Sequence, residues 1–132
     1  MNKDFVPVEL AKKLKEKGFD CEYPFAMYNK YEQFCPLYSS DKDYFGIDDF
    51  DKHACIAPTI SQVLKWLRDK KKIHIEIFLY DGKYSYFVKS ITQICEDDLF
   101  HECLNEDTTE EEYDSYEKAS LIGIKYVIYN LI

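Results

Sequence analysis

The chain of 132 residues is poor in glycine and lacks the glycine-rich motifs that cradle phosphate. It has four glycines and contains no G-x-x-x-x-G-K-[ST], no G-x-G-x-x-G and no G-x-S-x-G. Those motifs need glycine where a backbone approaches a phosphate or turns sharply at a nucleophile. Their absence argues against a P-loop nucleotidase, a dinucleotide-binding fold and an α/β-hydrolase.

Long apolar runs are also missing. No stretch approaches the roughly 18 apolar residues of a membrane span, and the first residues, MNKDFVPVEL, lack the apolar core of a signal peptide. The cysteines are odd in number and widely spaced, at Cys21, Cys35, Cys55, Cys95 and Cys103. We therefore expect reduced thiols, a cytoplasmic location and no membrane association.

Positive charge is in deficit, because 25 acidic residues face 17 basic ones and the net charge is −8. Such a chain repels a phosphate backbone, so we do not expect nucleic-acid binding. One basic segment stands out, formed by Lys65, Arg68, Lys70, Lys71 and Lys72. A run of this length is usually a solvated helix end, and phosphate binding is the less favoured interpretation.

Candidate metal ligands and nucleophiles fall into two groups, His53 with Cys55, and Cys95 with His101 and Cys103. Neither group has the C-x-x-C spacing of structural zinc sites. Free cysteine is more often an inert core residue than a nucleophile. We predict no metal, no cofactor and no catalytic residue.

His74 and Glu76 stand two apart in an alternating segment and could form an acid–base pair on a strand. A solvated or partner-facing strand surface is the favoured interpretation. The acids of DDFD and EDDLFHE do not fit a calcium loop, which needs a central glycine and a terminal Glu. An enzyme is therefore the least favoured class.

What the chain does contain is patterned apolar sequence, with 46% hydrophobic and 32% charged residues. These values are typical of a globular protein, and we predict one compact domain over residues 1–132. Helices are predicted over Pro7–Lys17, Ile60–Lys71 and Tyr116–Asn130. Thr59 and Gln62 match a capping box before the second helix, and Gly18 suits the left-handed end of the first.

The firmest prediction is a β-hairpin over Ile73–Ser90. Its alternation has period 2, and Asp81-Gly82 is a strong signal for a type I′ turn. That turn pairs Leu79 with Tyr84, Ile77 with Tyr86 and Ile75 with Val88 on the buried face.

Between Asp20 and Ala54 the pattern is weak. CEYPFAMY could be a strand that Pro24 confines to a sheet edge, and QFCPLY another short strand. The acidic stretch ICEDDLFHECLNEDTTEEEYD could hold one short strand or turn.

The predicted fold class is α+β, with an antiparallel sheet around the hairpin and about three helices packed mainly on one face. The predicted core consists of Leu10, Leu14, Val63, Leu64, Leu67, Ile75, Ile77, Tyr86, Val88, Ile122 and Tyr126. The C-terminal helix is apolar on several sides, which places it centrally or in a homodimer contact.

Three segments carry a resemblance: ELAKKLKEKGF, CIAPTISQVLKWLRDKKKIHIEI and SYEKASLIGIKYVIYNLI. Together they cover roughly half the chain, and they resemble a family of small proteins found in Bacteroides-group gut bacteria, their phages and other mobile elements. The resemblance implies a compact cytoplasmic protein of a mobile region. It supplies no catalytic residue.

Aromatic residues make up 17% of the chain, including 12 tyrosines, and surplus surface tyrosines suit contact with a partner. The favoured hypothesis is a non-enzymatic accessory protein that binds another protein through Tyr-rich loops or the outer sheet face. The alternative is a binder of a small nucleotide signal that counters host defence. Its candidate ligand-binding residues are Trp66, Lys65, Arg68, Lys70, His74 and Tyr80.

Overall fold

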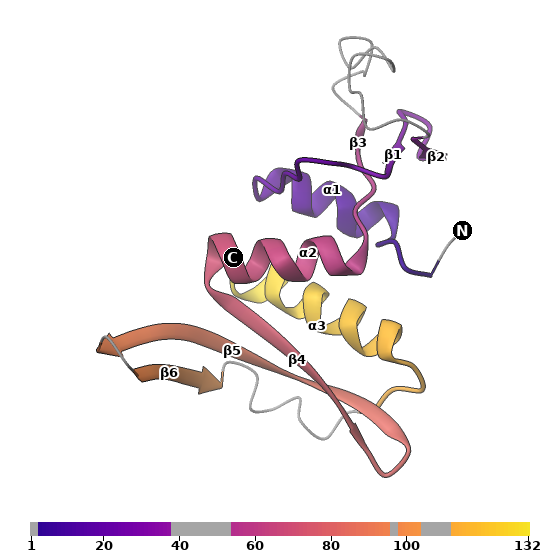
Figure 1. Ribbon diagram of the computed structural model, residues 1–132. Helices are drawn as coiled ribbons and strands as arrows, with labels where there is room; N and C mark the ends of the chain where they lie inside the picture. Colours follow the sequence, from indigo (N-terminus) through magenta and orange to yellow (C-terminus); the bar gives the residue numbers. More distant parts are fainter. Residues whose placement is uncertain (1–2, 38–53, 96–97, 104–111) are drawn as a thin grey trace. The chain divides into compact units, whose positions relative to one another are not determined.

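The computed structural model describes residues 3–37, 54–95, 98–103 and 112–132 (Figure 1). Its residue contacts divide the chain into two compact units, Met1–Gln62 and Val63–Ile132, and each is described by itself. In these described ranges, three α-helices and two small antiparallel sheets confirm the predicted α+β class, although the strands fall into two sheets where one was predicted. The single domain over residues 1–132 stays a prediction.

In the N-terminal unit, helix α1 spans Val8–Glu16. It starts one residue after Pro7, which is the N-cap and not the first helical residue as predicted. Gly18 has φ +87°, and the Phe19 N–H donates to the Leu14 carbonyl at 2.9 Å. This is the left-handed closure that the sequence predicts.

The sheet of the N-terminal unit contains β1 (Ala26–Tyr28), β2 (Phe34–Pro36) and β3 (Cys55–Ile56) in the order β2-β1-β3. The prediction that the first of these strands lies at an edge is wrong, because β1 is central. It starts two residues after Pro24, so the proline takes no position in the ladder. The predicted second short strand is β2, and β3 was not predicted.

Helix α2 (Ile60–Trp66) begins in the N-terminal unit and continues into the C-terminal one. Its capping box is confirmed. The Gln62 N–H donates to Thr59 Oγ1 at 3.1 Å, and the Thr59 N–H donates to Gln62 Oε1 at 3.0 Å. The predicted helix to Lys71 is completed by a π-helical turn, η2 (Leu67–Lys71), which ends at Lys72 with φ +56°.

In the C-terminal unit, β4 (Ile73–Tyr80), β5 (Lys83–Cys95) and β6 (Asp98–Cys103) form a sheet in the order β4-β5-β6. The predicted hairpin register is confirmed, with Ile75 opposite Val88 and Leu79 opposite Tyr84. Asp81 and Gly82 have φ of +52° and +77°, as a type I′ turn requires. β5 runs beyond the predicted Ser90, and β6 is the short strand of the acidic stretch.

Helix α3 (Tyr116–Asn130) contacts β4 and β5 (Figure 1). Ser115 caps it by accepting a hydrogen bond from the Lys118 N–H at 3.1 Å. The predicted core positions Ile122 and Tyr126 are only half-buried, whereas Ile124 and Ile128 are fully buried. The helix is apolar nearly all round, so its apolar pattern does not define one face, and Gly123 is a residue that it places against Ile75 and Tyr86 of the sheet.

Most of the predicted core is correct. The buried members are Leu10, Leu14, Val63, Leu64, Leu67, Ile75, Tyr86 and Val88. Ile77 is half-buried and Leu79 is 62% exposed, because the hairpin extends past its cover towards the turn. Among the described residues, none of the helices combines the length and apolarity needed to cross a membrane.

Candidate functional site

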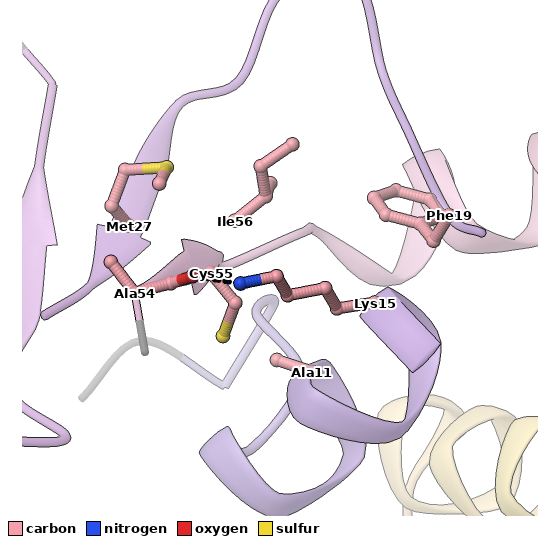
Figure 2. A pocket seen from close by; sticks show the side chains of 7 residues that line it. All are labelled: Ala11, Lys15, Phe19, Met27, Ala54, Cys55 and Ile56. Atoms are coloured by element: carbon pink, nitrogen blue, oxygen red, sulfur yellow. Dashed lines mark hydrogen bonds between the residues drawn. The ribbon is translucent and has the colours of Figure 1, made fainter. Parts of the chain in front are cut away.

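A pocket of about 240 Å³ lies in the N-terminal unit between α1 and the sheet (Figure 2). Most of its lining is apolar. The lining residues are Ala11, Lys15, Phe19, Met27, Ala54, Cys55 and Ile56. The hydrophobic spacing that buries one side of α1 brings Ala11 to the pocket, and the left-handed closure at Gly18 brings Phe19.

The pocket contains one cationic and one thiol group. The Lys15 ammonium donates to the Ala54 carbonyl at 2.7 Å, so the side chain reaches from α1 to the start of β3 (Figure 2). Burial raises the pKa of the Cys55 thiol above its usual range, against the opposing effect of Lys15 and Lys12. The thiol is therefore neutral at physiological pH, a state that is a poor nucleophile.

The chemistry of this lining suits binding more than catalysis. None of its described residues is a histidine or a carboxylate that would serve as a general acid or base beside Cys55. Apolar walls with one ammonium at the side accommodate an apolar side chain or a small apolar group.

The pocket adjoins a segment that exposes aromatic side chains. In the Tyr23–Tyr31 segment, Tyr23 is 58%, Phe25 56% and Tyr31 70% exposed. The Phe25 carbonyl accepts a hydrogen bond from the Leu37 N–H at 2.8 Å, which continues the β1–β2 ladder to Phe25. Phe25 comes directly before β1, two residues before the pocket residue Met27.

The turn that carries Tyr31 is ordered by Asn29. The Asn29 Oδ1 accepts hydrogen bonds from the Tyr31 N–H at 2.8 Å and the Gln33 N–H at 3.0 Å. Glu32, at φ +64°, forms an ion pair with Lys12 of α1. These contacts hold the turn in one conformation while the Tyr31 ring stays in solvent.

Tyr23, at the other end of the segment, is held through its backbone. The Gln62 Nε2 group donates to the Tyr23 carbonyl at 3.1 Å, and Gln62 is itself fixed by the α2 capping box. Both ends of the Tyr23–Tyr31 segment are thus tied to the N-terminal unit by side chains.

The residues predicted to bind a nucleotide signal are only partly brought together. Lys65, Arg68 and Lys70 are exposed on α2 and η2. Trp66 is only 8% exposed, and the Lys71 ammonium lies 5.4 Å from the centre of its ring. A buried indole has no open face for a base, so this placement does not favour stacking on Trp66.

The other two predicted ligand residues lie on β4. His74 is half-buried at its start, and Tyr80 is exposed at its end, six residues and roughly 20 Å along the strand. Glu76 forms an ion pair with Lys89, so the carboxylate of the supposed acid–base pair already has a cationic neighbour.

The two cysteine–histidine groups were the candidate metal ligands of the sequence. His53 lies outside the described residues. The register of β5 and β6 places Cys95 opposite Asp98, whereas His101 is opposite Ile91, three residues further along and roughly 10 Å away. Among the residues whose side chains the structure describes, no group of three His, Cys, Asp or Glu residues could hold a metal ion.

None of the protein-family models, curated proteins or solved structures compared with this chain matches it. The function is therefore inferred from the geometry of the chain itself.

The pocket was not predicted from the sequence, since it combines residues from α1, β1 and β3, and the two-residue strand β3 has no periodicity to detect. The exposed Tyr23–Tyr31 segment does fall within Asp20–Ala54. Its aromatic residues in a weakly patterned stretch were the available signal.

Proposed function

We propose that this chain is a non-enzymatic accessory protein that binds another protein through the Tyr23–Tyr31 segment and the adjoining pocket. The observation that carries the proposal is the exposure of three aromatic rings on a backbone fixed by Asn29 and Gln62. Tyrosine and phenylalanine are rigid and amphipathic, and they are enriched in protein interfaces.

Preorganisation supports this choice of surface. A segment that is already ordered loses little conformational entropy on binding, so more of its contact energy contributes to affinity. The pocket, which Met27 of this segment lines, provides a cavity of about 240 Å³ for an anchoring side chain. Protein interfaces concentrate binding energy in such desolvated pockets.

The cellular setting is part of the proposal. Among the cysteines whose side chains the structure describes, Cys35 and Cys55 form no disulfide, which supports action in a reducing cytoplasm. Membership of a family of phage and mobile-element proteins rests on the sequence resemblance alone. A nucleotide-signal binder is the alternative prediction, and the burial of Trp66 makes us place it second.

Photo-crosslinking tests the proposal. A photoreactive aromatic amino acid replaces Tyr31 in one protein and Tyr129, an exposed tyrosine of α3, in the control. We expect a discrete crosslinked partner from cell extract at Tyr31 and none at Tyr129. Phe25→Ala should abolish the crosslink with no change in thermal unfolding. Equal crosslinking at both positions, or none at Tyr31, contradicts the proposal.

A further inference from the structure

Along β4, the backbone hydrogen-bonding groups point alternately to β5 and to the outer edge of the sheet. In an antiparallel pair, residues that exchange hydrogen bonds alternate with residues whose amides face the other edge. The Ile91 N–H donates to the Lys72 carbonyl at 2.8 Å, and the register continues this series through His74 with Lys89 to Tyr80 with Lys83. The even-numbered residues of β4 therefore bond to β5.

The odd-numbered residues of β4 present their N–H and C=O groups to the outer edge of the sheet. They are Ile73, Ile75, Ile77 and Leu79. β4 is the edge strand in the order β4-β5-β6, and among the described residues none makes a backbone hydrogen bond with Ile75, Ile77 or Leu79 along this edge.

The sequence and register of β4 carry none of the usual features that discourage pairing at an edge. Exposed edges are normally short, bulged, or marked by Pro or Lys. β4 has eight residues in unbroken register with β5, and its sequence, IHIEIFLY, contains neither residue. Its single formal charge, Glu76, is neutralised by the ion pair with Lys89. The edge is long, regular and apolar, which is the form that accepts another strand.

We propose that this edge pairs antiparallel with the same edge of a second copy of the chain, which joins two three-stranded sheets into one of six strands. A two-fold axis at Ile77 places the outward amides of one copy against those of the other. Such an isologous contact needs a self-complementary surface. The pairing uses residues other than those of the Tyr23–Tyr31 segment and of α3, the helix for which the sequence predicts either a central position or a homodimer contact.

The side chains of β4 are compatible with this symmetry. Around Ile77, Ile75 lies opposite Leu79 of the partner strand, and both belong to the apolar row on the α3 side of the sheet. On the other side, Glu76 lies opposite Phe78, so no like charges face each other across the contact. Leu79, 62% exposed in one chain, acquires an apolar neighbour.

Two substitutions at Leu79 separate strand pairing from side-chain contact. Leu79→Pro removes an N–H that faces away from β5, so the hairpin keeps its ladder bonds. Leu79→Ala removes most of the same side chain and keeps that N–H. By sedimentation, we expect a wild-type dimer and a dissociation constant roughly 10- to 100-fold larger for Leu79→Pro than for Leu79→Ala, from two lost hydrogen bonds per dimer.

Hydrogen exchange provides a readout that does not depend on how the proline variant folds. In the wild-type chain, the amides of Ile75, Ile77 and Leu79 should gain protection as concentration rises and the dimer forms. The amides of Glu76, Phe78 and Tyr80 bond to β5 and serve as an internal control, protected at every concentration.

Three outcomes overturn the proposal. The first is a wild-type chain that remains monomeric at every concentration. This holds also where the β4 edge pairs only with a strand of another protein. The second is an equal loss of dimer in the two Leu79 variants. The third is a dimer in which the odd-numbered amides gain no protection.

Discussion

Gly123 of α3 lies directly above Ile75 of β4, so close that a Cβ on the glycine would stand 3.0 Å from Ile75 Cγ2 and 3.2 Å from the Tyr86 ring. Alanine is about 1 kcal/mol better than glycine inside a helix, but overpacking a core costs about 1–3 kcal/mol. Both neighbours are buried. We expect Gly123→Ala to lower the free energy of unfolding by about 1 kcal/mol, measured by urea denaturation.

A double-mutant cycle identifies the cause. Ile75→Leu removes the Cγ2 methyl and should recover part of the Gly123→Ala loss, whereas Ile75→Val keeps that methyl and should recover none. Additive effects in both cycles would show that the close approach does not limit stability.

The close approach also shows where sequence reasoning reached its limit. The hairpin was predictable because alternation and the Asp81-Gly82 turn specify the same register. The rotation of α3 was not, because apolar residues surround the helix. Gly123 lies against Ile75 and Tyr86 of the sheet, and Ile124 next to it is fully buried where Ile122 was predicted.

The N-terminal sheet was harder to predict for a different reason. Its strands have two or three residues each, too few for a period-2 pattern to appear. β1 and β3 are far apart in the chain, and the pocket forms only where they meet α1. A site made by long-range pairing of such short strands leaves little local signal in the sequence.

The capping box of α2 should make a measurable contribution to stability. Thr59→Ala removes the oxygen that accepts the Gln62 N–H, and we expect a loss of about 1 kcal/mol in the free energy of unfolding. Gln62→Glu is the matched variant, because it keeps the acceptor for the Thr59 N–H but removes the donor to the Tyr23 carbonyl. It should retain most of the stability yet weaken partner crosslinking at Tyr31. A Thr59→Ala protein as stable as wild type would refute the contribution.

The turn of the hairpin should tolerate asparagine better than alanine at Gly82. With φ at +77° and nothing within 4 Å of an added Cβ, any cost comes from the backbone and not from a clash. We expect Gly82→Ala to cost about 1–2 kcal/mol of unfolding free energy and Gly82→Asn clearly less, since asparagine enters the left-handed region more readily. Thermal and urea denaturation compare the two. An equal loss would point to a role for the glycine other than its conformation.

Cys55 should make the protein less stable in alkali. Burial raises the pKa of its thiol in the folded chain, so as the pH rises the unfolded chain loses this proton first. The contribution of Cys55 to stability is therefore complete below about pH 8.5, the usual thiol pKa, and declines above it towards the raised pKa.

Tyr28 adds to this pH dependence at higher pH, because burial and then Cys55 raise the pKa of its hydroxyl. We expect the free energy of unfolding, measured by urea denaturation at a series of pH values, to fall less steeply with pH in Cys55→Ala than in wild type. Parallel profiles for wild type and Cys55→Ala would mean that the Cys55 thiol is not protected from ionisation by the fold.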